Sequence, residues 1–351
     1  MSIERRFNAG VPQDPAQDHF VDEEGNFDIV RFILQTTNEV WDQQRFDRIH
    51  DYFAEEFVSY GAEGREFGDL DALYDYALPR TAAFPDTKVF VDDLLWTGNE
   101  EQGFKTSHSF TVTGTNTGTS TYGPPTGKRL RLTGIANCKV EKVNGEWKYT
   151  EERAEDDPFA ILRACTSGEP GTYPDLPEDE VEEGGSEAAG TPISNRESTD
   201  DATWSIEVEG DGFDPAAYLE SLVDELWNDR SVGAIGDYYA EDVVVEAASG
   251  RRLRTTDELR TEVLGRLGAF PDLDVTIDDM MVVEEDDGYN SSIAYTATGT
   301  HAGPSKYGSA SGTEVTFTGL LNQKLRNVGG AWRVVHCRED FDERRLMRLL
   351  K

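Results

Sequence analysis

The 351-residue sequence has little cysteine and no long run of apolar residues. Its three cysteines, Cys138, Cys165 and Cys337, are too few and odd in number for a disulfide framework in a chain of this size, and they lack zinc-ligand spacing. They indicate a reducing, cytoplasmic environment. Because no run of 18 apolar residues occurs, we expect no membrane span, and the first residues lack the apolar stretch of a secretion signal.

Lysine is also scarce, with nine among the 33 basic residues, whereas 69 residues are acidic and the formal net charge is −36. Nucleic acid is not an expected partner, because no basic stripe is available to meet phosphates. Self-repulsion destabilises so acidic a chain in dilute buffer, and molar salt shortens its range to about 3 Å. We therefore expect a protein of a salt-loving cytoplasm, such as that of a halophilic archaeon. An acidic tail for basic partners is the alternative, but the acidic residues are spread along the chain.

What the sequence does contain is one pattern written twice. Gly114-Thr115-Asn116-Thr117-Gly118 recurs as Gly299-Thr300-His301-Ala302-Gly303, and Tyr122 recurs 185 residues later as Tyr307 (307 − 122 = 185). Upstream motifs recur after 186 residues, as Trp41 does (227 − 41 = 186). One residue is lost between turn-like segments, where a deletion costs little. Repeats of this length indicate a duplicated domain, because each copy can hold its own core.

The duplication predicts four regions of the chain. Residues 1–17 are a flexible lead-in, 18–165 the first domain, 166–203 a linker and 204–351 the second domain. The linker is rich in Gly, Pro, Ser, Glu and Asp, which predicts a disordered and self-repelling segment.

Each copy shows helical periodicity first and strand periodicity afterwards. The expected helices cover 28–41, 46–57 and 69–82, and 214–227, 232–243 and 256–268 in the second copy. Asp28 and Asp214 are the expected N-caps. The expected strands cover 89–96, 104–112, 130–143 and 146–153, and 275–282, 289–297, 315–328 and 332–338 in the second copy. This order predicts an α+β fold with helices packed on a curved antiparallel sheet.

Several of these motifs resemble the SnoaL-like polyketide cyclase family. Both copies have the Phe-Pro-Asp motif and the five-residue glycine motif, but only the second has the family histidine, His301. Conversely, Pro125-Thr126-Gly127-Lys128 of the first copy becomes Ala310-Ser311-Gly312-Thr313 in the second. The family belongs to a superfamily named after nuclear transport factor two. The resemblance implies two tandem cone-shaped domains.

The resemblance also implies a chemistry. In cyclases of this family an aspartate before the terminal helix removes a proton from a carbon next to a carbonyl group, and the ring closure needs no metal and no organic cofactor. Asp157 and Asp342 look like the residues in that place, one repeat apart (342 − 157 = 185). A carboxylate can act as base where an apolar interior raises its pKa. Each aspartate is also a good helix N-cap, so capping alone is an alternative.

Two histidines are candidate substrate-binding residues. His301 matches the histidine of the family motif, and its alternative role is that of a turn residue. His108 lies on the apolar side of its expected strand, where its alternative role is that of a satisfied core histidine. The corresponding residue of the second copy is Ile293.

The last strand of each copy offers further candidates. Alternation predicts that Tyr149, Glu151 and Arg153 share one face, and that His336 and Arg338 do so in the second copy. A Glu-Arg or His-Arg pair near the aspartates could form a polar pocket floor. The alternative is an ion pair on a face where two sheets meet.

Two functions fit these observations. The first is a cofactor-independent cyclase or isomerase that acts on a small carbonyl compound, with an aspartate as base inside an apolar cone. The second is a non-catalytic protein that binds a small molecule or a partner, since each copy lacks part of the motif set. The two copies are expected to pair within the chain as a pseudo-dimer. An open interior would favour catalysis, and a filled interior would oppose it.

The charge of the chain makes one prediction. Dialysis from molar salt into dilute buffer should unfold the protein, because repulsion among its acidic residues is then no longer screened. Circular dichroism at the two salt concentrations measures the loss of helix. An undiminished helical spectrum in dilute buffer would refute the salt dependence.

Overall fold

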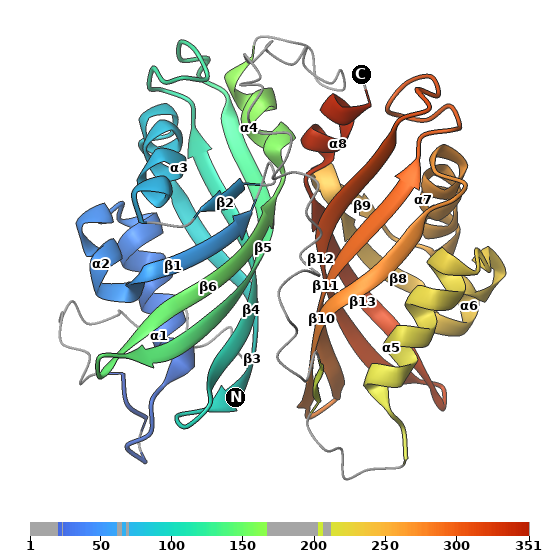
Figure 1. Ribbon diagram of the computed structural model, residues 1–351, viewed down its shortest axis with the longest axis horizontal. Helices are drawn as coiled ribbons and strands as arrows, with labels where there is room; N and C mark the ends of the chain where they lie inside the picture. The colour runs from blue at the N-terminus through green and yellow to red at the C-terminus, as the bar shows by residue number, and fades with distance from the viewer. Residues whose placement is uncertain are drawn as a thin grey trace. The chain divides into compact units, whose positions relative to one another are not determined.

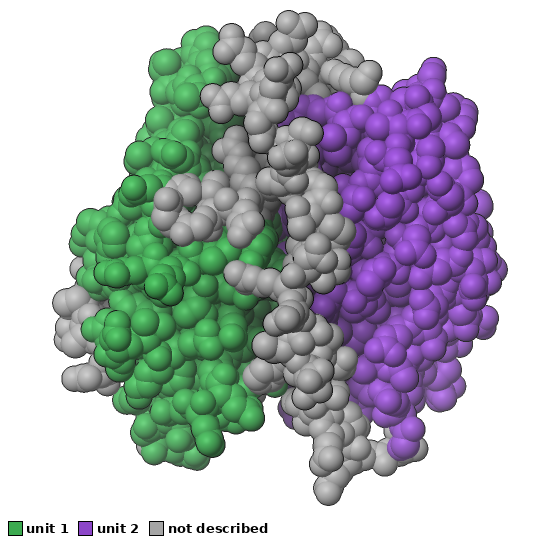
Figure 2. All heavy atoms as spheres, viewed as in Figure 1, with its two compact units in different colours: residues 1–61, 65–154, 159–174 green, residues 62–64, 155–158, 175–351 purple. Residues whose placement is uncertain are grey.

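The computed structural model describes residues 20–22, 24–61, 65–67, 70–166, 203–205 and 212–350. They belong to two compact units (Figure 2), residues 1–61, 65–154 and 159–174, and residues 62–64, 155–158 and 175–351. Each unit holds nearly all of one copy of the repeat, so we call the described residues 20–166 the first domain and the described residues 203–350 the second. The expected lead-in over 1–17 and, apart from its end residues 166 and 203, the expected linker lie outside the described residues. The predicted domain boundaries stay a prediction.

In the first domain, helices cover one face of a sheet with strand order β2-β1-β6-β5-β4-β3 (Figure 1). β1 runs parallel to β6, and β3, β4 and β5 pair in antiparallel fashion. The helices are α1 (Ile29–Thr36), the π-helix η3 (Thr37–Asp42), η4 (Phe46–Arg48), α2 (Ile49–Tyr52), α3 (Leu70–Ala83) and α4 (Pro158–Cys165). The strands are β1 (Phe53–Gly61), β2 (Arg65–Phe67), β3 (Lys88–Asn99), β4 (Gly103–Thr115), β5 (Arg129–Val143) and β6 (Glu146–Asp156).

The second domain repeats this plan, with strand order β7-β10-β11-β12-β13-β8-β9. Its helical segments are α5 (Pro215–Val223), η8 (Asp224–Asn228), η9 (Val232–Ala234), α6 (Ile235–Tyr238), η10 (Ala248–Gly250), α7 (Thr256–Ala269) and α8 (Glu343–Leu349). Its strands are β7 (Thr203–Ser205), β8 (Tyr239–Ala247), β9 (Arg251–Leu253), β10 (Asp274–Glu285), β11 (Gly288–Thr300), β12 (Glu314–Val328) and β13 (Ala331–Phe341). The expected α+β class with helices on a mainly antiparallel sheet is therefore confirmed in both copies.

The predicted helix starts are confirmed at atomic detail. The Asp28 carboxylate accepts a hydrogen bond from the Arg31 backbone N–H at 3.0 Å. The Asp214 carboxylate accepts from the N–H groups of Ala216 and Ala217, at 3.0 Å each. Within the described residues, no helix has the length and apolar character needed to cross a membrane.

The second helix expected in each copy is wrong over its second half. The chain leaves the helix after Tyr52, and Phe53 has extended backbone angles that begin β1. The same change follows Tyr238 in the second domain. Apolar residues at 49, 52, 53 and 57 fit a helical spacing, but backbone pairing with β6 makes residues 53–61 a strand.

A bulge in β13 reverses the alternation along the last strand. Lys324 pairs with His336 and Leu325 pairs with Val334, so Val335 is an extra residue in β13. Val334 and Cys337 both lie in the core. Residues on either side of the bulge therefore do not share the faces that simple alternation predicts.

The glycine motif of the second domain closes a loop against the end of α7. Ala302 and Gly303 donate backbone hydrogen bonds to the Ala269 carbonyl oxygen at 3.0 and 3.2 Å. A Cβ atom on Gly303 would lie 1.9 Å from the Gly268 carbonyl oxygen, so only glycine permits this approach. In the first domain, a Cβ atom on Gly118 would likewise lie 1.7 Å from the Ala82 carbonyl oxygen.

Gly303→Ala should therefore destabilise the fold by about 3 kcal/mol, because either the loop or α7 must shift. The matched control is Gly265→Ala in α7, where an added Cβ meets no atom within 4 Å and stability should stay equal or rise slightly. Thermal unfolding in molar salt measures both variants. Equal melting temperatures for Gly303→Ala and the wild type would contradict the steric argument.

Candidate functional site

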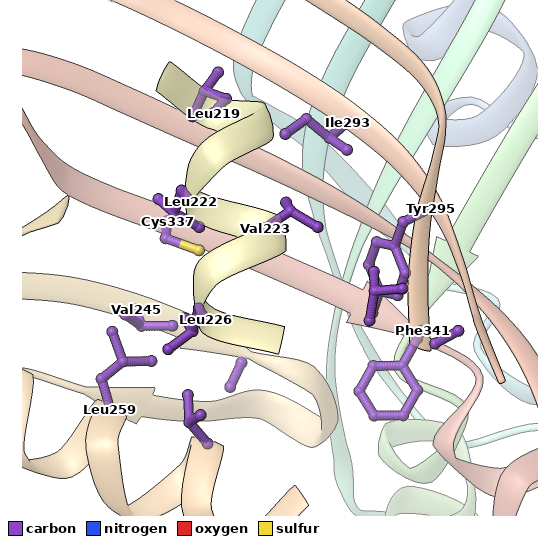
Figure 3. Close-up of a cluster of buried hydrophobic side chains, with 14 of the residues drawn as sticks. Leu219, Leu222, Val223, Leu226, Val245, Leu259, Ile293, Tyr295, Cys337 and Phe341 are labelled. Atoms are coloured by element: carbon purple, nitrogen blue, oxygen red, sulfur yellow. The ribbon is translucent and has the colours of Figure 1, made fainter. Parts of the chain in front are cut away.

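The interior of the second domain is filled. Leu219, Leu222, Val223 and Leu226 on the α5–η8 helix face strand residues that include Ile293, Tyr295, Cys337 and Phe341 (Figure 3). These four strand residues are 0%, 5%, 4% and 1% exposed. They belong to one continuous apolar cluster among the described residues. We call the sheet face that carries them, on which the helices pack, the interior face.

The main polar contact of this interior is an ion pair that is already satisfied. Arg266 of α7 donates two hydrogen bonds to Glu339 of β13, both at 2.7 Å, and the Tyr295 hydroxyl donates a third at 2.7 Å. Although burial opposes ionisation, Arg266 holds the pKa of Glu339 below its usual value. A carboxylate held in this way is a poor base, because its lone pairs are engaged and its proton affinity is low.

A second group of buried charges in this domain also has its ion-pair and hydrogen-bond partners within the domain. Glu343, which is fully buried, contacts Lys306 and Ser249 and accepts a hydrogen bond from Tyr307 at 3.0 Å. Glu262 of α7 pairs with Arg251. Although burial opposes ionisation, Arg251 and Lys306 lower the pKa of Glu262 to about 2.

The first domain differs at three positions of the interior face. Ser59 of β1, His108 of β4 and Glu152 of β6 stand where the second domain has Val245, Ile293 and Cys337 (245 − 59 = 186; 293 − 108 = 185; 337 − 152 = 185). We call these three residues the interior polar set. All three counterparts lie in the apolar cluster of the second domain.

Strand register places the interior polar set on one face. Ser59 is the direct neighbour of Glu152 across the β1–β6 pair, and it lies two residues beyond Phe57, which is in the core. His108 pairs with Ala136 of β5, which is also in the core. β5 lies between β4 and β6 (Figure 1). Two of the three side chains thus flank β5 from either side.

The interior of the first domain is less completely filled. Half-buried side chains on its interior face include His108, Phe110, Val112 and Glu152, whereas the matching residues Ile293, Tyr295, Ala297 and Cys337 are at most 5% exposed. Its buried apolar residues form two clusters among the described residues, and Phe110 packs against both. Several side chains of this interior face, two of them titratable, are therefore less completely covered than their counterparts in the second domain.

The environment changes the protonation of two of these groups. Burial raises the pKa of Glu152 to about 7 and lowers the pKa of His108 to about 4. Near neutral pH, the imidazole is uncharged and the carboxyl group exchanges protons readily. The Nδ1 atom of His108 has no hydrogen-bond partner among the described residues. The imidazole and the carboxyl group, on the two strands that flank β5, can each donate or accept a proton.

The two predicted catalytic aspartates are buried at the expected helix starts. Asp342 is 6% exposed and caps α8, because its Oδ1 accepts a hydrogen bond from the Arg345 backbone N–H at 2.8 Å. Asp157 is 2% exposed and lies between β6 and α4. Capping by Asp342 matches the alternative drawn from the sequence. A catalytic role of either residue stays a prediction.

The family histidine, His301, forms hydrogen bonds within its own loop. Its Nδ1 accepts a hydrogen bond from the Ser311 backbone N–H at 3.3 Å, and its Nε2 lies 3.0 Å from the Ser305 hydroxyl. His301 is fully buried. Asn116 does the same in the first domain, where its side chain bridges the Thr126 backbone N–H and the Ala83 carbonyl oxygen. These contacts engage both ring nitrogens, and ligand binding by His301 stays a prediction.

The predicted polar face of the last strand is divided by the bulge. Tyr149 lies in the core, whereas the Arg153 guanidinium lies 5.8 Å from the centre of the Tyr60 ring. In the second domain Arg338, 3% exposed, lies on the face opposite Cys337 and contacts Asp340 at 3.2 Å. His336 lies on that same opposite face. Tyr149 therefore does not share a face with Glu151 and Arg153, whereas His336 and Arg338 do share one, as alternation predicts.

Sequence reasoning missed Ser59 and Glu152 as possible site residues. Ser59 lay just beyond the helix predicted over 46–57 and outside every predicted strand, and Glu152 lay on the wrong face under simple alternation. A signal was nonetheless present, because the second copy carries apolar Val245 and Cys337 at the same places. Within the described ranges, no group of three or more His, Cys, Asp or Glu side chains is arranged to hold a metal ion.

The comparisons with known proteins agree with this fold. The model of the SnoaL-like polyketide cyclase family matches the chain twice, over residues 31–164 and 217–348. The chain belongs to this family, in two tandem copies. No curated protein matches it.

Solved structures of the same fold resemble one domain at a time. A proposed SnoaL-like polyketide cyclase from Jannaschia sp. CCS1 is 16% identical, with 40% of this chain and 92% of that chain covered and a TM-score of 0.34. IdmH from Streptomyces antibioticus, a proposed polyketide cyclase, is 18% identical, with 38% and 96% covered and a TM-score of 0.32. AclR from Streptomyces galilaeus, a proposed hydroxylase, is 21% identical, with 42% and 83% covered and a TM-score of 0.33.

The ion pair of the second domain predicts a pH-dependent stability. Glu339→Gln should destabilise the protein by about 3–5 kcal/mol at pH 7, because Arg266 then stays buried without its counter-charge. The pKa of Glu339 is lowered on folding, so its contribution is present above the ordinary value of 4.5 and is lost as the pH falls through the folded pKa. Melting temperatures from pH 7 to pH 3 should therefore converge for the variant and the wild type.

Glu284→Gln is the matched control, because Glu284 is exposed in the same domain and its melting curve should follow the wild type at every pH. A constant gap between Glu339→Gln and the wild type down to pH 3 would contradict the assignment of the charge pair.

Proposed function

We propose that the protein acts on a small carbonyl compound inside its first domain, by removing a proton from a carbon next to the carbonyl group. Ring closure or isomerisation then follows from the enolate. A carboxylate of the first domain serves as the base; in cyclases of this family that role falls to an aspartate at the place of Asp157, and Glu152 is the other candidate. Family membership supports the class of reaction.

The half-buried side chains on the interior face of the first domain are the observation that carries this proposal. A reaction of this type needs room for the substrate and a carboxyl group whose pKa is near the working pH. Both conditions are supported for the first domain by half-buried interior side chains and by the raised pKa of Glu152. The filled interior of the second domain offers neither.

The alternative is a non-catalytic role, and it has support in the second domain. Its interior is packed, and its buried carboxylates Glu339 and Glu343 are already paired. This domain would then serve as a scaffold or a binding partner for the first, with the two copies paired within the chain. Asp342 would act there only as a helix cap.

Exchange of carbon-bound hydrogen for deuterium tests the proposal directly. In deuterium oxide the protein should accelerate the exchange of protons next to the carbonyl group in one or more of a series of small ketones, followed by proton NMR. Ala154→Phe should lower this rate at least about tenfold, because Ala154 lies half-buried on the interior face and a larger side chain there takes the place of the substrate.

Leu78→Phe is the matched control, because it adds an aromatic ring at a position of α3 that is 51% exposed and should leave the exchange rate unchanged. Thermal unfolding checks that both variants fold. Exchange at the uncatalysed rate for every ketone would refute the proposal. Equal rates in Ala154→Phe and the wild type would refute the location.

A further inference from the structure

We propose that Glu152, rather than the aspartate before the terminal helix, is the base of the reaction, and that His108 donates a hydrogen bond to the carbonyl oxygen of the substrate. The inference rests on the proposed function and assigns its residues. It also predicts the substrate class, an uncharged compound with an acidic C–H next to a carbonyl group.

Position on the sheet separates Glu152 from the other carboxylates. Its strand neighbour Ser59 follows the core residue Phe57 on the same face, so the Glu152 side chain emerges on the interior face. Burial raises the pKa of the Cys138 thiol and of the Tyr149 hydroxyl, both in the core, and the charge of Glu152 raises both further. Asp342, at the start of the terminal helix of the second domain, differs in that its Oδ1 caps α8.

The contrast between the two domains gives independent support. The second domain has the same fold with Val245, Ile293 and Cys337 in place of the interior polar set, and its interior is packed. Apolar side chains therefore suffice for the fold at these three places. A buried carboxyl group and an imidazole nitrogen without a partner carry a desolvation cost, which a ligand that offers hydrogen bonds would offset.

His108 is suited to the carbonyl oxygen. A neutral imidazole carries one N–H group, which can donate to an oxygen that gains negative charge during the reaction. Its ring lies on β4 beside Phe110, with centroids 6.1 Å apart, and its Nδ1 is unpartnered among the described residues. Neither His108 nor Ser59 is charged near neutral pH. The interior polar set thus favours an uncharged substrate over an anion.

The step balances without a further reactant. The Glu152 carboxylate takes the proton from carbon, and the electron pair of the C–H bond moves onto the carbonyl oxygen, where His108 stabilises the enolate. The enolate carbon then takes back a proton from Glu152 or attacks a second carbonyl group of the same molecule. In the second case the new alkoxide oxygen receives the proton from Glu152.

Exchange and binding are measured together with cyclohexanone as the probe. In deuterium oxide, Glu152→Gln should lower the wild-type exchange rate by about 100-fold or more, and His108→Gln by about 10–100-fold. Asp157→Asn should keep most of the rate. Exposed Glu284 supplies the control variant Glu284→Gln. Glu152→Cys, which copies the second domain, replaces Glu152→Gln if that variant does not fold.

Binding is read from the ring signals of the five histidines, with the His108 signal assigned by its absence in His108→Gln. Cyclohexanone should shift the His108 signal in the wild type. Exchange that survives in Glu152→Gln and is lost in Asp157→Asn would overturn the inference and keep the proposed function. A shifted His108 signal without exchange would overturn the role of Glu152 as base, and the proposed function falls only when every ketone of the series fails to exchange. No shift and no exchange would overturn both the base and its site.

Discussion

The bulge in the last strand is the constraint on which the chemistry of this fold depends. Successive side chains of a strand point to opposite faces, so one extra residue exchanges the faces for everything that follows. In β13 the extra residue directs Cys337, Glu339 and Phe341 to the interior. The same change of phase brings Glu152 inward after Tyr149 in the first domain. Without it, Glu151 would face the helices and Glu152 would face away from them.

Duplication let the two interiors diverge over a common framework. The second domain fills its interior with apolar side chains and pairs its buried charges, among them Arg266 with Glu339. The first domain keeps a half-buried histidine and glutamate at places that a stable fold does not require to be polar. Buried polar groups cost free energy unless they are paired. Their retention in one copy alone is the pattern expected where one copy binds a ligand and the other supports the fold.

The family motif forms hydrogen bonds within its own loop in both copies. His301 and Asn116 differ in chemistry, yet each hydrogen-bonds within its own loop, and the following glycine lets that loop approach a helix end. A motif of this kind identifies the fold because its contacts are local and geometric. It says little about the reaction, which depends on side chains that face the interior.

Much of the fold could be predicted from the sequence, because its signals are local. The repeat fixed the number of domains, Asp28 and Asp214 marked helix starts, and alternation located most strands. The candidate site could be predicted only in part. His108 was recognised from its strand pattern, but Ser59 was missed because the apolar spacing up to Phe57 fits a helix, and Glu152 was missed because of the bulge.

The sequence by itself determined the duplication, the α+β class and the family, since each of these depends on residue spacing along the chain. Only the tertiary structure decided which side chains face the interior and which interior is filled. Pairing of β1 with β6 overrides the local helical preference, and one extra residue in the last strand changes which face a side chain occupies. β1 and β6 are far apart in the chain, and the bulge is defined only by the pairing of β13 with its neighbouring strands, so the residue pattern within one segment encodes neither effect.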